Sequence, residues 1–467
     1  MAALSGRSTG APGRPAPRAP RWTGRTRRGV LAALGAGGVL AACVPGGGTA
    51  PGSAPGARPP ASIRHLARGP DQYFKLQREL RDLFQARVSN IQVEIDESPG
   101  DWYQKFVTQS ASGTPPDAIF ECDCRIGGSV RTGLVEQLDP WLAREKRFKA
   151  DAWHDVTWYA STYRGKRWAL PWDGGAVALY YNRQLFQAAN VREPDPRKPL
   201  TWEELVPLAQ RLTVDANGRR AGESGFDPTQ VRQHGFDPAR GYWQIYLYGA
   251  GGEVIEKDGK VPIDSAPAVA GLRFLEDLLN KHYVAPSPRY QTPQPVRWQD
   301  GNVAMVMSGV WNLAAYRQYA FDWDVVPTPA GKTRATIGWW SMMALTPGSK
   351  QKEAAWEWIF WNVSEEGLRH SVTYGVSMPP LKSLRSAFVQ PGKPPRNQEV
   401  FYDEIDPRWL RAPGDRYGSY FGDYVAEFRN IFNREFNPVW AGERTVAEAA
   451  KIARPKLEHL LKTGEET

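Results

Sequence analysis

The fold is decided by residues 62–120, which run Ser62-Ile63-Arg64-His65-Leu66, then 71–85, then Ile91-Gln92-Val93-Glu94-Ile95, then 102–112, and finally Asp117-Ala118-Ile119-Phe120. The first, third and last segments are short and carry alternating or continuous apolar residues, so they predict strands. The two longer segments have the apolar spacing of amphipathic helices. Strand, helix, strand, helix and strand at this spacing predict βα units on a largely parallel sheet.

Charged residues follow two of these predicted strands. Arg68 comes just beyond the first strand, and Glu121 and Asp123 come just beyond the third. Ligands of parallel α/β sheets bind at the carboxyl ends of the strands. These three residues are therefore candidates to hydrogen-bond the hydroxyl groups of a ligand. The alternative is that they are solvated loop residues.

The rest of the chain is predicted to be mostly helical with short strands between the helices. A glycine-rich segment, Asp173-Gly174-Gly175, interrupts this pattern where a flexible backbone would be useful. Strands are expected at residues 168–170, 177–180, 323–326 and 341–345, and helices at 202–212, 242–248, 266–280, 352–362, 418–433 and 445–462.

The N-terminus has the pattern of an export signal. Basic Arg27-Arg28 precedes a short apolar stretch that ends in Leu40-Ala41-Ala42-Cys43. Cys43 at the cut site is typical of a bacterial lipoprotein, in which the thiol takes a lipid. Residues 44–61 are then a flexible tether rich in Pro, Gly and Ala. Both the twin-arginine route and the general secretory route remain open, with the twin-arginine route slightly favoured.

The basic charge of the chain belongs to this export segment. The formal charge is +9, but residues 1–43 hold seven of the 59 basic residues and none of the 50 acidic ones. The rest of the chain has 52 basic and 50 acidic residues, a charge of +2. No footprint for nucleic acid remains, and we expect lipid at Cys43 to hold the protein at the outer face of the cytoplasmic membrane.

The other two cysteines are Cys122 and Cys124. Side chains two positions apart in a strand point to opposite faces, so a disulfide between them is not expected. Without a partner Cys-x-x-Cys, and with six scattered His, a zinc site is not expected either. We predict two free, mostly buried thiols, and no metal or cofactor.

Aromatic residues are abundant, with 19 Trp, 18 Tyr and 17 Phe. Large flat side chains serve cores, and they also serve ligands that are half apolar and half hydroxyl. A sugar ring is such a ligand, because its C–H face stacks on an indole while its hydroxyl groups need polar partners. Composition therefore favours an uncharged, hydroxyl-rich ligand.

Several motifs occur in the order and spacing of one family. They are Pro116-Asp117-Ala118-Ile119, Gly133-Leu134-Val135-Glu136-Gln137-Leu138-Asp139, Leu200-Thr201-Trp202-Glu203-Glu204-Leu205, Gly301-Asn302-Val303-Ala304-Met305 with Gly309-Val310-Trp311, and Glu353-Ala354-Ala355-Trp356. The chain resembles the extracellular solute-binding proteins of ABC importers, in their sugar-binding branch. The resemblance spans roughly residues 62–460.

The resemblance implies an α/β, two-lobed periplasmic-binding-protein-like fold of type II. Each lobe would be a mostly parallel sheet flanked by helices, and a hinge would let the lobes close around a ligand. Lobe 1 would comprise residues 62–173 and 328–363, and lobe 2 residues 174–327 and 364–467. The implied partners are a small-molecule ligand, most plausibly a carbohydrate, and ABC permease subunits. We expect a monomer.

Trp311 is the first candidate for a stacking platform in the cleft. A tryptophan packs more often in a core, but the Gly-Val-Trp motif of the resemblance favours the cleft. Trp339 and Trp340 are adjacent, so only one can face the cleft if they lie on a strand. The predicted ligand-binding residues, besides Arg68, Glu121 and Asp123, are Trp172, Asp173, Trp243, Trp311, Trp339, Trp340 and Tyr374.

Other functions remain open at this point. A secreted glycosidase would use two carboxylates, and acidic residues are too common here to exclude that. A lipoprotein of the same fold that binds a non-sugar solute, or that acts as a sensor or adhesion partner, is a further alternative. Residues 44–467 contain no Gly-x-Ser-x-Gly, no His-Glu-x-x-His and no Walker loop, which argues against several other chemistries.

Overall fold

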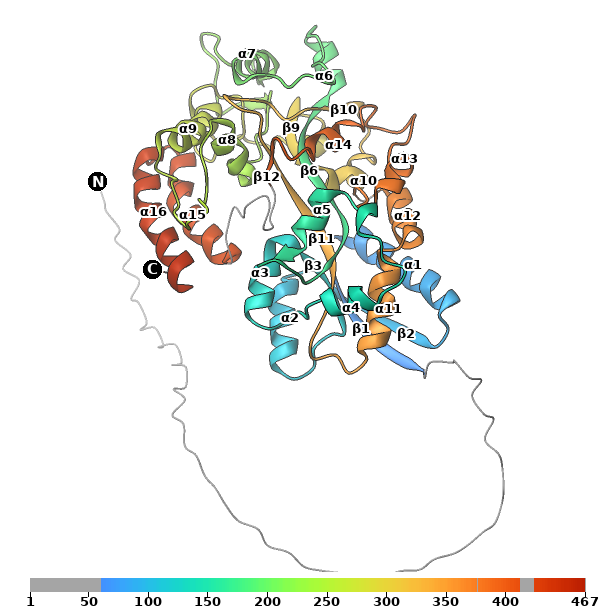
Figure 1. The fold of residues 1–467 in the computed structure, drawn as a ribbon. Coiled ribbons are helices and arrows are strands. Elements are labelled where there is room, and N and C mark those ends of the chain that lie inside the picture. The colour runs from blue at the N-terminus through green and yellow to red at the C-terminus, as the bar shows by residue number, and fades with distance from the viewer. Residues whose placement is uncertain (1–59, 376, 412–423, 467) are drawn as a thin grey trace, which may run out of the picture. The chain divides into compact units, whose positions relative to one another are not determined.

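The computed structural model describes residues 60–375, 377–411 and 424–466. Cys43, the export segment and nearly all of the tether lie outside these residues, as do residues 412–423. Within the described part, strands in the order β10-β6-β11-β3-β1-β2 form one sheet, with β9 paired to β6 and β12 paired to β11. Helices pack around this sheet (Figure 1), and the predicted α/β class is confirmed.

The first part of the chain folds as its pattern predicts. It forms β1 (Ala61–Arg68), α1 (Asp71–Arg87), β2 (Ile91–Ser98), α2 (Trp102–Ala111) and β3 (Ala118–Cys122). β1 pairs in parallel with both β2 and β3. Helix α2 begins at Trp102 because the side chain of Asp101 accepts a hydrogen bond from the backbone N–H of Gln104 and so caps the helix.

The centre of the sheet differs from the prediction. The strands expected at 168–170 and 177–180 are one buried strand of 13 residues, β6 (Leu170–Asn182). It pairs antiparallel with β9 (Met305–Gly309), β10 (Trp323–Val326) and β11 (Thr336–Leu345). β11 also runs antiparallel to β3. The prediction of mostly parallel sheets therefore holds for β1, β2 and β3 and is wrong for the crossing strands.

The glycines of β6 are needed for close packing rather than for a break in the strand. A Cβ atom on Gly174 would lie 2.5 Å from the backbone oxygen of Trp339, and one on Gly175 would lie 2.5 Å from Cγ1 of Val310. Both glycines also have a positive φ, 157° and 145°. Because these two positions lack a side chain, the strand can pass close to β11 at Gly174 and close to Val310 and Met378 at Gly175.

Several of the predicted helices are present, and short elements that were not predicted lie between them. The expected helices at 202–212, 266–280 and 352–362 are present with those bounds. The helix expected at 418–433 is described from Val425 onward. The elements are α3 (Asp123–Arg131), α4 (Asp139–Arg144), α5 (Asp155–Ala160), β4 (Thr162–Tyr163), β5 (Lys166–Arg167), α6 (Arg183–Ala188), α7 (Trp202–Leu212), β7 (Val214–Asp215), β8 (Val231–Gln233), α8 (Trp243–Gly249), α9 (Ala266–Asn280), α10 (Leu313–Tyr316), α11 (Lys352–Asn362), α12 (Glu365–Tyr374), α13 (Arg385–Phe388), α14 (Val400–Glu404), β12 (Leu410–Arg411), α15 (Val425–Trp440) and α16 (Val446–Thr463), with short 3-10 helices at Ala150–Ala152, Arg240–Tyr242, Trp298–Asp300, Val310–Asn312 and Lys382–Leu384.

Two hydrophobic cores lie on either side of β6. The first core gathers residues of β1, β2, β3, α1 and α11, and the second gathers residues of α7, α8, α9, α15 and α16. Ala178 and Tyr180 of β6 belong to the first core, while Val177 and Leu179 belong to the second, because successive strand residues face opposite sides. Figure 1 shows α1 and α11 in one group and α8, α9, α15 and α16 in another.

Helices α12, α13 and α14 contribute to the first core, although the sequence placed them with lobe 2. The boundaries of the lobes stay a prediction. Among the described residues, the helices are each too short or too polar to cross a membrane.

Candidate ligand-binding site

A cavity of about 400 Å³ lies where β3, β6 and β11 meet residues of the second core. It brings together Arg68, Asp173, Trp311, Trp339 and Trp340, which the sequence predicted as ligand-binding residues. The other described residues of its lining are Gly69, Pro70, Gln72, Tyr73, Phe120, Cys122, Cys124, Gly174, Tyr242, Asn312, Ser341 and Arg429.

A polar row crosses the sheet at the floor of this cavity. Ser341 of β11 pairs with Cys122 of β3 on one side and with Asp173 of β6 on the other. Residues that face each other across neighbouring strands share one face of a sheet. The side chains of these three residues therefore lie on the same face and all reach the cavity.

A β-bulge gives Asp173 its place in that row. On β6, Asp173 pairs with Ser341 and Pro171 pairs with Met342, so Trp172 is the extra residue of the bulge. A bulge changes the face to which the following side chain points. Asp173 consequently faces the cavity, whereas Trp172 is fully buried in the first core, with its ring 4.8 Å from that of Phe120.

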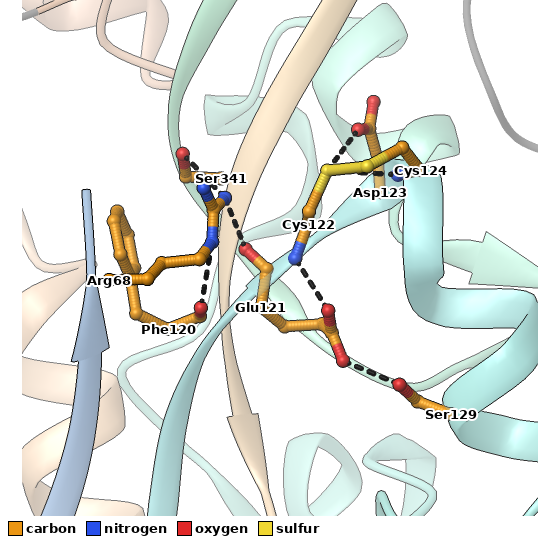
Figure 2. Close-up of a disulfide and its surroundings, with 8 residues drawn as sticks. All are labelled: Arg68, Phe120, Glu121, Cys122, Asp123, Cys124, Ser129 and Ser341. Carbon is orange, nitrogen blue, oxygen red and sulfur yellow. Dashed lines mark hydrogen bonds between the residues drawn. A yellow bond between two sulfur atoms is a disulfide. The ribbon is translucent and has the colours of Figure 1, made fainter. Parts of the chain in front are cut away.

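Arg68 and Asp173 are held by a network of hydrogen bonds. The Arg68 guanidinium donates to the backbone oxygens of Phe120 at 3.0 Å and Glu121 at 2.9 Å. It also donates to Oγ of Ser341 at 3.2 Å (Figure 2). Its hydrogen bonds to the described residues use Nε and Nη2. Arg68 is the last residue of β1, and not beyond the strand as predicted.

The Asp173 carboxylate is buried and accepts a hydrogen bond from the hydroxyl of Tyr73 at 2.9 Å. Burial raises the pKa of Asp173, while the hydrogen bonds from Ser341 and Tyr73 and the positive charge of Arg68 oppose that rise. This network holds a carboxylate and a guanidinium at the floor of the cavity.

Three aromatic rings form a second wall. The ring centroids of Trp311 and Trp339 lie 5.4 Å apart in an edge-to-face arrangement. The ring centroids of Tyr242 and Trp339 lie 5.7 Å apart. The Trp311 ring rests against Gly309, where a Cβ atom would lie 2.0 Å from it. Trp339 is half-buried on the side of the second core, and Trp340 is buried in the first core. The two adjacent tryptophans thus point to opposite faces as the alternation predicts, although atoms of both reach the cavity.

Glu121 and Asp123 are not among the described residues that line the cavity, and their role in ligand binding stays a prediction. Glu121 lies within β3 and not beyond it, and its carboxylate accepts hydrogen bonds from Oγ of Ser129 at 2.6 Å and the backbone N–H of Cys122 at 2.8 Å (Figure 2). Asp123 is the first residue of α3 and is buried. Burial raises the pKa of both carboxyl groups.

Trp243 and Tyr374 also lie outside the lining of the cavity. The ring of Trp243 stacks on Phe432 at 3.8 Å in the second core. Tyr374 ends α12, where the ammonium of Lys75 lies 5.9 Å from its ring. Tyr242, which the sequence analysis did not single out, takes the place expected for Trp243, because it precedes the helix and faces the cavity.

The two cysteines near the cavity are joined in a disulfide, so the prediction of free thiols is wrong. The prediction assumed that both residues lie on one strand. Instead β3 ends at Cys122, which caps α3, and the chain turns so that the two Cα atoms lie 5.2 Å apart. That separation suits a disulfide. Both cysteines line the cavity.

The cavity has a polar floor at the crossing strands and an aromatic wall on the side of the second core, which fits the two-lobed α/β solute-binding protein that the sequence resembles. Comparison with known proteins agrees. The chain belongs to the bacterial extracellular solute-binding protein family, whose model matches residues 70–368.

Individual relatives are distant. A putative binding protein of Brucella abortus is 25% identical over 292 residues, covering 61% of this chain and 67% of that protein. A maltotriose-binding protein of Pyrococcus abyssi is 22% identical over 290 residues, covering 60% of this chain and 58% of that protein. The structure of an ABC substrate-binding protein from Listeria monocytogenes in complex with cycloalternan superposes with a TM-score of 0.75 at 20% identity, covering 86% of this chain and 99% of that one. The likeness confirms the two-lobed fold.

Proposed function

We propose that this protein captures a sugar or oligosaccharide in the cavity between its two cores and delivers it to the permease of an ABC importer. One observation carries the proposal. The aromatic wall of Tyr242, Trp311 and Trp339 faces a polar floor that holds Arg68 and Asp173.

The two surfaces match the two kinds of surface on a sugar. The C–H faces of a pyranose ring stack on indole and phenol rings. Its hydroxyl groups accept hydrogen bonds from a guanidinium and donate them to a carboxylate, and such charged partners give the strongest bonds. Relatives that bind maltotriose or cycloalternan support this class of ligand.

The crossing strands supply the hinge in this proposal. β6 and β11 pass between the two cores, and the cavity lies beside them at Asp173, Gly174 and Ser341. A ligand that touches both walls binds the closed form more tightly than the open form and so favours closure. The permease then receives the closed, loaded protein.

The composition of the floor favours binding over hydrolysis. Glycosidases place two carboxyl groups about 5 to 9.5 Å apart around the bond they cleave. Among the described residues that line the cavity, Asp173 alone carries a carboxylate. Glu121, a possible second one, is turned toward Ser129. We therefore propose a receptor that releases its ligand unchanged.

A thermal-shift screen tests this function. The purified protein is melted with neutral mono- and oligosaccharides, polyols and polyamines, and the incubated carbohydrates are then analysed by chromatography. We expect one class of carbohydrate to raise the melting temperature by a few degrees, because ligand at a hundredfold excess over its Kd stabilises the folded state by about 2.7 kcal/mol. Shortened products would indicate an enzyme, and stabilisation by polyamines alone would indicate another solute.

We also propose that lipid at Cys43 anchors the protein, since the apolar stretch before it and the Pro- and Gly-rich segment after it fit a lipoprotein. We expect Cys43→Ser to move the protein from the membrane fraction to the soluble fraction, because the residue that takes the lipid is lost. Fractionation and immunoblotting measure this. Cys122→Ser serves as a matched control that leaves the anchor in place, and full membrane retention of Cys43→Ser would contradict the proposal.

A further inference from the structure

The disulfide between Cys122 and Cys124 lies in the wall of the cavity, where the proposed function gives it no role. It joins the last residue of β3 to the second residue of α3. Cys124 is the more exposed of the two, and Cys122 retains 9% exposure. A small molecule that enters the cavity therefore meets this bond.

The disulfide is coupled to the polar floor through the backbone. Cys122 pairs with Ser341, the same residue that accepts a hydrogen bond from Arg68. The backbone oxygens of Phe120 and Glu121, directly before Cys122, hold the Arg68 guanidinium (Figure 2). A change in the turn that follows β3 therefore acts directly beside the two backbone oxygens that hold Arg68.

The surroundings also accommodate an opened disulfide. The backbone N–H of Cys124 points at Sγ of Cys122 at 3.2 Å, a contact that stabilises a thiolate there. Once protonated, that thiol lies 3.4 Å from Oδ1 of Asp123 and can donate to it. Asp123 is 3% exposed, and its Oδ2 has no hydrogen-bond partner among the described residues.

We propose that the Cys122–Cys124 disulfide is a redox-sensitive part of the ligand pocket, which bound carbohydrate shields and whose opening weakens binding. The proposal rests on the proposed function. Opening separates two bonded sulfur atoms to van der Waals distance beside Ser341, and it releases the turn directly after Phe120 and Glu121, whose backbone oxygens hold Arg68. Both changes alter the floor on which the ligand rests.

The exchange needs a small-molecule thiol. Its thiolate attacks Sγ of Cys124, the S–S bond breaks, and its electron pair goes to Sγ of Cys122, which the N–H of Cys124 stabilises. A second thiolate attacks the mixed disulfide and releases Cys124. Two external thiols become one external disulfide, two electrons pass to the protein, and both cysteines end as thiols after taking up two protons.

Binding and reduction must influence each other equally. If reduction weakens binding about tenfold, saturating ligand must shift the thiol–disulfide equilibrium about tenfold toward the disulfide. For a two-electron couple this shift is about 30 mV. A disulfide that plays no part in binding gives no shift.

The test uses the Cys43→Ser protein, whose remaining cysteines are Cys122 and Cys124. Calorimetry measures the affinity of the protein for two ligands, before and after reduction with dithiothreitol. The ligands are maltotriose and the carbohydrate that stabilises the protein in the screen. Alkylation and mass spectrometry count the thiols, with two expected after reduction. We expect about tenfold weaker binding by the reduced protein and recovery on reoxidation. We also expect slower reduction when ligand is present, because a ligand in the cavity covers the disulfide.

The variant Cys122→Ser/Cys124→Ser in the same background is the matched control, and we expect it to bind like the reduced protein and to ignore the reductant. Equal affinity of protein with zero and with two thiols would overturn this inference and leave the proposed function standing. If the oxidised protein bound no carbohydrate at all, both would fail. The reduction experiment stands by itself even where the double variant does not fold.

Discussion

Trp311→Ala is expected to weaken carbohydrate binding about a hundredfold while the protein still folds. Contact of a sugar with about 100 Å² of the indole is worth about 2.5 kcal/mol at about 25 cal/mol/Å², and each 1.4 kcal/mol is tenfold in affinity. Trp311 is half-buried and rests on Gly309 and Trp339, so its loss removes a surface of the cavity and not the centre of a core.

Calorimetric titration measures the affinity of this variant, and its melting curve without ligand reports the fold. Trp158→Ala is the matched control, because Trp158 is also half-buried but stacks on Phe148, away from the cavity. Unchanged binding by Trp311→Ala would show that the aromatic wall is not the ligand site. A variant that fails to fold would place Trp311 among the core residues.

Asp173→Ala is expected to lower the free energy of unfolding by about 3 kcal/mol and to weaken ligand binding. The substitution leaves the buried hydroxyl of Tyr73 without its acceptor and removes the negative charge beside Arg68. Removing one partner from a buried, charged hydrogen-bonded group costs about 1.5 to 5 kcal/mol.

Urea unfolding without ligand measures this loss. Asp173→Asn is the matched control, since its side-chain oxygen still accepts from Tyr73 while the charge is gone. We expect the asparagine variant to lose less stability than the alanine variant and to show a comparable loss of affinity. Equal stability of all three proteins would contradict the hydrogen-bond network described here.

The sequence predicts the fold well where the pattern is local. β1, β2 and β3 and the helices between them follow from short apolar runs and helical spacing within residues 61–122. The antiparallel partners of β6 could not be predicted in this way, because Met305 and Trp340 reach the strand from distant parts of the chain. Periodicity gives the type of an element but not its partner.

The sequence predicts only part of the cavity lining, because the direction of some side chains also depends on how the strands pair. Trp311, Trp339 and Asp173 reach the cavity, but Trp172 does not, because the bulge on β6 turns its side chain into the first core. The alternation of apolar and polar residues in the sequence does not reveal where a β-bulge occurs. Tyr242 lines the cavity but was not predicted to do so. It directly precedes the predicted Trp243, at the start of α8.

The prediction of free thiols is wrong because it depends on a strand that continues through Cys122 and Cys124. If Cys122-Asp123-Cys124 were a continuous strand, the two thiols would point to opposite faces and no bond between them would be expected. Two features indicate that the strand ends at Cys122 and a helix follows. The strand from Ala118 to Cys122 is short, and the acidic Asp123 after it suits the first turn of a helix.

We propose that the cavity beside Asp173 and Trp311 binds a carbohydrate and leaves it unchanged. Calorimetric titration of the oxidised protein with the carbohydrate found in the thermal screen, followed by chromatography of the recovered ligand, tests it most directly. We expect saturation at one ligand per chain, a negative heat-capacity change from burial of apolar surface, and recovery of intact ligand. A titration without saturation for every carbohydrate in the panel, or the appearance of cleaved products, would contradict it.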